Sequence, residues 1–512
     1  MPNPDDRVPD LFIDGQWQRP RQAGETQAGR GIGAYDTKHR KLIRGFSWLA
    51  WIVVLGLTGF LLFGNIMSQQ EQKVAEMSKG ELLQPIYAGK FAVGMRKLSD
   101  TPGLEPFGEQ AADFVKTLDS GPIEQRFCHS IALNEFEGVD EALARLERLR
   151  EQVAKIDPKL EYNETQVRLE SILKNIFKNV KTETPPQVSD SDAEFLKDKL
   201  AWFGDLALNT EASKSPGREA LIGRAETSVM MAMSAVIVGI LMLLLGCVLF
   251  FVFSAKLFGS GLKHRVVDNS RYGPVYIETF AIWMLLFLGV SLAVALQGRG
   301  GMEISVTAMV MLVPLSALIW PVIRGVPNSD LMDDIGLRVG NPLVEIGAGI
   351  VGYLAMMPVI FAGAIASVIV MLVMSLLQGP GSHEFAPTGV PHPIANEAFG
   401  GDLVSVMVTI FFIASVLAPI TEEIMFRGVL YRHLRDASHR MARWGSIIFA
   451  ALVSSLVFAA IHPQGLAGIP VLTTLAVGFC LVRQWRGSLV APMTMHAIHN
   501  GIATSMLIPL IY

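Results

Sequence analysis

The sequence has few of the residues that mark the commoner kinds of functional site. It contains three cysteines in 512 residues, two of them inside apolar runs, so neither a disulfide framework nor a CxxC metal site can be built. The HExxH motif of zinc proteases and the GxSxG motif of serine hydrolases are also absent. The net charge of -4 is small and the basic residues cluster beside apolar runs, which does not favour binding to nucleic acid.

Apolar residues, in contrast, are abundant. They make up 51% of the chain and 18% of residues are charged, a balance too apolar for a soluble globular protein. Runs of membrane-spanning length recur and predict an all-α, polytopic membrane protein with about nine transmembrane helices. These runs lie near residues 46–67, 228–254, 275–296, 304–323, 343–377, 403–426, 444–461, 468–483 and 488–511.

The beginning of the chain predicts how it is oriented. Residues 1–45 are polar and without apolar periodicity, which predicts a disordered cytoplasmic tail. The basic stretch at 38–44 precedes the apolar run 46–67, so we interpret this run as a signal-anchor transmembrane helix. Under the positive-inside rule the N-terminus is then cytoplasmic, and we expect an integral protein of the plasma (inner) membrane.

A polar region separates the anchor from the remaining apolar runs. Residues 68–225 are predicted to form an extracytoplasmic helical region, within which apolar stripes over 143–156 and 169–180 indicate a helical hairpin. Residues 226–400 are predicted to be mainly transmembrane helices. The last segment, 401–512, also carries polar groups inside its apolar runs.

Two adjacent carboxylates, Glu422 and Glu423, follow the apolar run that begins at 403. A charged side chain at the centre of a membrane helix costs roughly 2.5–3.5 kcal/mol, so the pair requires a reason. Arg427 shares a helix face with Glu423, whereas Glu422 lies about 100° further round. We interpret Arg427 as offsetting one carboxylate while the other acts on a water molecule. The alternative is that both carboxylates meet headgroup water at a helix end.

Histidines and an asparagine supply two further polar positions. In LVFAAIHPQG, His462 follows Phe458 by four residues and comes at the end of a span, where it either meets water or faces a site. In PMTMHAIHNG, His496 and Asn500 lie one turn apart on one face of the last span, with His499 near the same side. Such groups are costly in an apolar helix unless they face a polar cavity, and a structural hydrogen-bond network is the alternative.

Together these side chains provide the groups that hydrolysis requires. A carboxylate can activate water as a general base. An imidazole can protonate a leaving amine or hold a metal ion. A carboxamide can donate a hydrogen bond to a developing oxyanion.

The same segments resemble the motifs of a known family, the CPBP (or Abi) intramembrane proteases, named for CAAX prenyl endopeptidases and bacteriocin-processing proteins. The resemblance covers about residues 403–505, makes 401–512 a CPBP-like protease core, and leaves 1–300 outside. DIGLRVGNPL at 334–343 also resembles a segment often found upstream of that core. The family motifs EExxxR, FxxxH and HxxxN are matched in order by EEIMFR at 422–427, FAAIH at 458–462 and HAIHN at 496–500.

The resemblance implies a role for each matching residue. Glu422 would be the main catalytic carboxylate that activates water, and Glu423 would assist it or pair with Arg427. His462 and His496 would line the cavity, and Asn500 would stabilise the tetrahedral intermediate. Family members are described both as metalloproteases and as metal-independent glutamate proteases. If zinc (Zn²⁺) is the cofactor, the resemblance implies Glu422, His462 and His496 as its ligands, with an open fourth position.

We therefore expect an intramembrane endopeptidase that hydrolyses peptide bonds of membrane-associated proteins or peptides with a glutamate-activated water. Prenylated CAAX proteins are the substrates that the family name implies. One alternative is a transporter or channel that uses the same charges as a conduction path, and such a protein would spread polar residues along several spans. Another is a non-catalytic scaffold or immunity protein that retains the fold.

One geometric conflict accompanies this interpretation. Simple topology puts His462 at the external end of its span and His496 only about eight residues into the last span, nearer the cytoplasm. At 1.5 Å per helical residue the two would lie roughly 15 Å apart in depth. Either a span begins at a different depth than drawn, or the groups do not converge.

Overall fold

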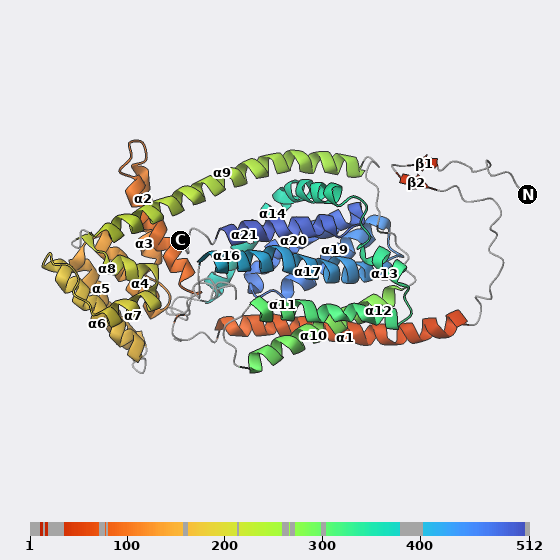
Figure 1. Cartoon of the computed structure of the whole chain (residues 1–512), viewed down its shortest axis with the longest axis horizontal. Helices are drawn as coiled ribbons and strands as arrows, with labels where there is room; N and C mark the ends of the chain where they lie inside the picture. The colour runs from red at the N-terminus through yellow and green to blue at the C-terminus, as the bar shows by residue number, and fades with distance from the viewer. Residues whose placement is uncertain are drawn as a thin grey trace, which may run out of the picture. The chain divides into compact units, whose positions relative to one another are not determined.

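The structure is a computed structural model, and its helices account for most of the residues that it describes (Figure 1). The chain divides into two compact units, Met1–Leu49 and Ala50–Tyr512, each considered by itself. The described residues are 11–13, 16–18, 35–70, 77, 80–156, 162–211, 215–258, 266, 272–297, 304–378 and 403–506.

The first unit contains two short strands and the start of a long helix. Strands β1 (Leu11–Ile13) and β2 (Gln16–Gln18) pair antiparallel, with Phe12 opposite Trp17. This pairing departs from the expected disordered tail. The sequence between the strands is Asp-Gly, a strong hairpin signal that the prediction overlooked. The rest of the tail before residue 35 lies outside the described residues.

Helix α1 (Tyr35–Gln70) continues into the second unit and includes a 21-residue apolar segment, Ser47–Met67. This segment coincides with the predicted anchor. Across the described residues, eight helical segments are long and apolar enough to cross a membrane. The predicted class, an all-α polytopic membrane protein, is confirmed. The ninth expected span corresponds to α21 (Val490–Ser505), which has sixteen residues and falls below that length.

The remaining membrane helices form one bundle, which we call the membrane bundle (Figure 1). Within it, α14 is a single helix with Pro358 inside, and it packs against α9, α20 and α21. The helices of the bundle are α9 (Pro216–Phe258), α10 (Gly273–Leu296), α11 (Ile304–Leu312), η2 (Val313–Leu318), α12 (Ile319–Ile323), α13 (Asn328–Ile335), α14 (Pro342–Gln378), α16 (Leu403–Phe412), η3 (Ile413–Leu417), α17 (Ala418–Glu423), η4 (Ile424–Leu430), α18 (Tyr431–Ala437), α19 (Arg443–Ala460), α20 (Gly465–Arg486) and α21.

Glycines bring the helices around α14 into close contact. A Cβ placed on Gly349 would lie 2.6 Å from the backbone oxygen of Ala491 on α21. A Cβ on Gly246 of α9 would lie 2.4 Å from the backbone oxygen of Leu354. Small residues let membrane helices approach to backbone contact, where dispersion and weak hydrogen bonds stabilise the pair. Gly349 and Gly246 therefore allow backbone contact of α14 with α21 and α9.

Seven shorter helices form a separate layer of the second unit, which we call the helical domain. The predicted hairpin is present, because α5 ends at Ile156, before Asp-Pro, and α6 begins at a capping box of Asn163 and Gln166. The helices are α2 (Leu83–Leu98), α3 (Pro106–Thr117), α4 (Ile123–Phe136), α5 (Val139–Ile156), α6 (Glu164–Lys181), α7 (Asp190–Leu200) and α8 (Trp202–Leu208).

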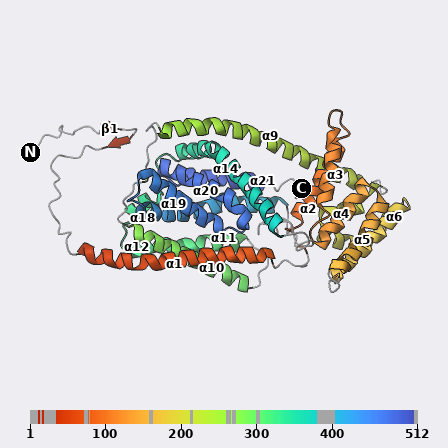
Figure 2. The same ribbon diagram turned by 180° about the vertical axis from the view of Figure 1, so that it is seen from behind.

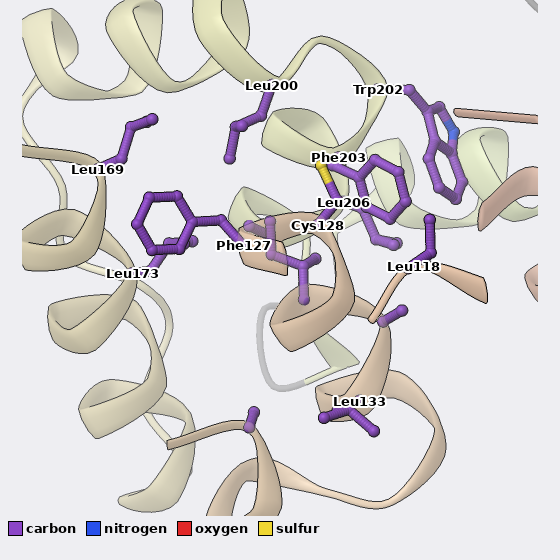
Figure 3. Close-up of a cluster of buried hydrophobic side chains, with 14 of the residues drawn as sticks. Leu118, Phe127, Cys128, Leu133, Leu169, Leu173, Leu200, Trp202, Phe203 and Leu206 are labelled. Carbon is purple, nitrogen blue, oxygen red and sulfur yellow. The ribbon is translucent and has the colours of Figure 1, made fainter. Parts of the chain in front are cut away.

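A hydrophobic core holds the helical domain together. Figure 3 shows side chains from several helices meeting around Phe127 and Cys128 of α4, with Leu169 and Leu173 of α6 on one side and Phe203 of α8 on another. All five are fully buried. Burial of each large apolar side chain contributes about 1.5–3 kcal/mol, so this core stabilises the packing of the helices against one another.

The helical domain and the membrane bundle share one continuous helix, α9 (Figures 1 and 2). Leu221 and Ala225, near the start of α9, belong to the core of the helical domain. A Cβ on Gly94 of α2 would lie 2.4 Å from the backbone oxygen of Ala225, so α2 and α9 are in backbone contact. The boundary that sequence analysis placed at residue 225 therefore falls inside a helix.

An ion pair between a buried arginine and a half-exposed aspartate in the helical domain supports a prediction about its stability. Arg145, whose side chain is 5% exposed, donates from Nε to Oδ1 of Asp119 at 2.9 Å. Burial opposes ionisation of Asp119, but hydrogen bonds from His129 and Arg145 outweigh it and lower its pKa to about 2. We expect Asp119→Asn to destabilise the domain by about 1–3 kcal/mol at neutral pH, since it leaves Arg145 buried without its carboxylate.

The pH dependence of that difference follows from the sign of the shift. A depressed folded-state pKa contributes stability above the ordinary value near 3.8, and this contribution is lost as pH falls toward 2. The measurement is amide hydrogen exchange of α4 and α5 in the full chain, compared between wild type and variant. Equal protection of the two proteins at pH 7 would show that the pair does not stabilise the domain.

Candidate active site

One long helical segment, 403–437, carries the first group of polar residues and is not a regular α-helix. It contains two π-helical stretches, η3 and η4, on either side of α17. In a π-helix the oxygen of Ala414 would accept from the N–H of residue 419, and Pro419 has none. The side chain of Asn500 donates to that oxygen instead, at 2.7 Å. The proline thus creates the unpaired carbonyl that fixes Asn500 against the helix.

Glu423 and Arg427 form the i,i+4 ion pair that their spacing predicts. Arg427 Nη1 lies 2.9 Å from Glu423 Oε1, and both side chains are 0% exposed. The guanidinium also lies over the rings of Phe458 and Phe479, at 4.6 and 4.9 Å from their centroids. Since Glu423 is fully enclosed, the alternative that both carboxylates meet headgroup water at a helix end is wrong.

His496 is oriented by the same carboxylate. Its Nδ1 lies 2.9 Å from Glu423 Oε1, so Nδ1 carries the proton that is donated to the carboxylate. The ring also stacks on Phe479, with centroids 5.0 Å apart. Its other nitrogen, Nε2, is then a free acceptor, and it lies 3.8 Å from Glu422 Oε2.

The His462 ring is oriented by a backbone carbonyl, as the His496 ring is oriented by a carboxylate. Its Nδ1 lies 2.5 Å from the oxygen of Phe458, the first residue of the FxxxH motif, and its ring packs on the Phe458 ring with centroids 4.2 Å apart. This fixes the proton on Nδ1 and leaves Nε2 as the acceptor. That atom lies 3.9 Å from Glu422 Oε2.

Three acceptor atoms therefore converge on one point: Glu422 Oε2 and the Nε2 atoms of His462 and His496. Glu422 Oε2 is buried and has no hydrogen-bond partner among the described residues. Buried polar atoms are normally paired, so an unpaired carboxylate oxygen between two imidazole acceptors needs a donor from outside the protein. A water molecule, with two protons to donate, has the required chemistry.

The depth conflict raised by the sequence is resolved by where α21 begins. The turn before α21 packs against other helices of the bundle. The backbone N–H of Leu489 donates to the backbone oxygen of Gly336. The Cδ1 atom of Leu489 would lie 3.4 Å from a Cβ placed on Gly428. Glu422 precedes Gly428 by six residues and His496 follows Leu489 by seven, so each lies about 9–10 Å along its helix from this shared level.

A cavity of about 740 Å³ encloses these groups. Apolar side chains of α10 and α11, among them Trp283, Phe287 and Met311, form part of the cavity wall. Sequence analysis missed this wall, because aromatic and aliphatic residues in a membrane helix carry no signal that separates a cavity lining from a lipid contact. His499 also lines the cavity, and its Nδ1 lies 3.4 Å from the hydroxyl of Tyr353.

The arrangement does not match the spacing of a zinc site. Ligands at about 2.0–2.1 Å around a tetrahedral ion lie about 3.4 Å from one another. The two Nε2–Oε2 distances to Glu422, 3.9 Å for His462 and 3.8 Å for His496, both exceed that spacing. Over the described part of the chain, no group of three or more His, Cys, Asp or Glu side chains is placed to hold a metal ion.

Fold and site together define a class: a polytopic all-α membrane protein with a glutamate, two histidines and an asparagine around a mainly apolar cavity. Residues 404–502 match the family described as type II CAAX prenyl endopeptidase Rce1-like. The membrane-embedded CAAX protease MroQ of Staphylococcus aureus (strain USA300) is 32% identical over 120 residues, which are 21% of this chain and 47% of MroQ. The C-terminal part of the chain is thus similar to the CPBP, or CAAX protease, family.

These likenesses cover a limited part of the chain. The chain spans about half the length of the curated relative it matches. No solved structure matches it. The helical domain and α1 precede the matched region, so neither is part of what the comparisons describe.

Proposed function

We propose that this protein is an intramembrane endopeptidase that hydrolyses peptide bonds of membrane-associated proteins or peptides. The observation that carries the proposal is the convergence of Glu422, His462 and His496 at one buried point beside an apolar cavity. The family of the matched region supports the same reaction class. A transporter or channel would need polar groups along a path through the bundle, whereas this cavity is lined mainly by apolar side chains.

Glu422 is the proposed general base. Its carboxylate takes a proton from the water that it shares with the two imidazoles, and the oxygen of that water attacks the substrate carbonyl. The proton then passes to the leaving amine, from Glu422 or through an imidazole. Glu423 is proposed to act indirectly, since its Oε1 lies against Arg427 and His496. Its proposed role is to hold the His496 ring so that Nε2 faces the water.

Asn500 is proposed to stabilise the tetrahedral intermediate. Its amide has two N–H groups, and the contact to Ala414 uses one of them. The other can donate to the oxyanion from the cavity wall, where Asn500 lies together with Glu422. The contact to Ala414 places the amide before the substrate arrives, so little reorganisation is needed during the reaction.

The orientation of the chain remains the one predicted from its basic residues. The basic stretch 38–44, which precedes the apolar segment of α1, predicts a cytoplasmic N-terminus, and the helical domain then lies outside, at the plasma (inner) membrane. We propose a substrate with an apolar segment in the membrane, because the cavity is lined mainly by apolar side chains. A prenylated chain end is one substrate of this kind, and a transmembrane segment is another.

The test of the proposed activity is a search for cleavage products. The full chain is reconstituted in liposomes with quenched fluorescent peptides that carry an apolar span of about 20 residues, some of them prenylated. We expect fluorescence to increase and mass spectrometry to identify a defined new N-terminus. Ion or solute flux through these liposomes without cleavage of any peptide would contradict the proposal and favour a transporter.

The spacing of the three acceptors predicts how chelators act. Because no group of three or more His, Cys, Asp or Glu side chains among the described residues is placed to hold a metal ion, we expect EDTA and 1,10-phenanthroline to leave the cleavage rate within about twofold. Metal analysis of the active preparation is the control. Loss of activity that added Zn²⁺ restores would show that the three residues close around an ion.

A further inference from the structure

The part of the chain before the family match reaches the candidate active site at two places. The first is a hydrogen bond from α1. Asn65 donates from Nδ2 to the backbone oxygen of His462 at 2.9 Å, although 397 positions separate the two residues. A carboxamide in an apolar span is costly unless it is paired. Here the pair is made with the turn that carries one of the proposed catalytic imidazoles.

This contact is placed where it can fix the His462 ring. His462 follows the last turn of α19, and its own N–H bonds to the oxygen of Ala459. The ring is fixed by Phe458, through both the Nδ1 contact and the ring packing. Asn65 holds the backbone oxygen of the same residue from a different helix. A displacement of this turn would carry Nε2 away from Glu422.

The second place is the turn that leads into α2, together with the first residues of that helix. Gly80, Glu81, Leu83 and Gln84 line the same cavity as Glu422. Gly80 and Leu83 are buried, whereas Gln84 is exposed. The turn adds a carboxylate and a carboxamide to a cavity whose walls are otherwise mainly apolar. It is also firmly placed, because α2 packs against α3 and α9 within the helical domain.

We propose that the N-terminal region completes the active site, with Asn65 as a positioning residue for His462 and the turn into α2, with the first residues of that helix, as a wall that selects substrates. This inference rests on the proposed endopeptidase activity. It assigns the substrate a composition: an apolar segment in the cavity, flanked on the α2 side by a polar residue that can hydrogen-bond to Gln84. The helical domain is then part of the catalytic unit rather than an appended module.

The first arm of the test measures kcat and KM for the full chain in liposomes, with the peptides described above. Asn65→Leu removes the amide at similar volume and suits an apolar helix. We expect kcat to fall about tenfold while KM stays within about twofold, because a displaced group affects the chemical step. Asn65→Gln, which keeps the amide, should restore most of the rate. Thr58→Val is the matched control, since the Thr58 hydroxyl on the same helix has no hydrogen-bond partner among the described residues.

The second arm measures substrate preference with two peptides that differ only in the residue flanking the apolar span, Gln in one and Leu in the other. We expect wild type to have a lower KM for the Gln peptide than for the Leu peptide. Gln84→Leu should change the ratio of the two KM values by about five- to tenfold, so that the preference is lost or reversed. Glutamine and leucine differ little in volume, so the change reports hydrogen bonding rather than space.

The two arms separate failure of this inference from failure of the proposed function. If wild type cleaves no peptide, or Glu422→Gln cleaves as well as wild type, the endopeptidase itself is wrong. The other outcome is that wild type cleaves and Glu422→Gln does not. If Asn65→Leu then has the kcat of wild type, and Gln84→Leu has the peptide preference of wild type, the inference alone is overturned. Rates are normalised to the folded fraction. If Asn65→Leu does not fold, the Gln84→Leu preference decides the outcome.

Discussion

Glu422→Gln is expected to lower kcat by about a thousandfold or more while leaving KM and the folded fraction near wild type. Glutamine keeps the size of the side chain and can still hydrogen-bond to water, but it cannot accept a proton. The Glu422 side chain is 23% exposed to the cavity and carries no ion pair with lysine or arginine in the described structure, so its charge is not needed for folding. The measurement is steady-state cleavage in liposomes, with circular dichroism to assess folding.

The control for this variant is a glutamate far from the cavity. Glu219 is exposed near the start of α9, and Glu219→Gln should leave kcat unchanged within about twofold. The kcat of Glu423→Gln should lie between those of Glu219→Gln and Glu422→Gln, because Glu423 orients His496 without taking a proton from water. Equal cleavage by wild type and Glu422→Gln would assign the general base to another group.

Arg427→Met is expected to have the largest effect on stability. The substitution keeps most of the volume of the side chain but leaves Glu423, which is 0% exposed, without its cation. Removing one partner of a buried ion pair costs about 3–5 kcal/mol, a large share of the 5–15 kcal/mol that stabilises a typical protein. Thermal unfolding of the purified protein, followed by tryptophan fluorescence, would measure the loss.

A second variant distinguishes the charge from the packing. The double variant that combines Glu423→Gln with Arg427→Met removes both charges. We expect its free energy of unfolding to lie within about 1–2 kcal/mol of that of wild type. Arg148→Met is the surface control, since Arg148 and its partner Glu141 are both exposed and such pairs contribute about 0–1 kcal/mol. A double variant as unstable as Arg427→Met would mean that Arg427 acts through its contacts with the aromatic rings.

Much of the fold could be read from the sequence because membrane spans leave a strong, local signal. The apolar runs located the eight spanning segments, and the leucine and isoleucine spacing located α5 and α6. The pairing of Glu423 with Arg427 was also predictable, since four residues on a helix fix the geometry. Each of these depends on residues close together in the sequence.

The rest depends on contacts between distant residues, and sequence patterns do not encode those. The position of α21 in the bundle is set by the turn at Leu489, which lies against Gly336 and Gly428. The π-helical stretch before Pro419 has no signature apart from the proline itself. The contact of Asn65 with His462 joins residues 397 positions apart. None of these could be inferred from hydropathy or motif spacing.

The central claim is that Glu422 and the two imidazoles act as one unit on one water, and a double-mutant cycle on kcat tests it most directly. The cycle compares wild type, Glu422→Gln, His462→Gln and the double variant under identical conditions. Groups that act as a unit are non-additive, so the double variant should be no more than about threefold slower than the slower single variant. If the two losses multiply instead, the carboxylate and the imidazole act independently, and the account is contradicted.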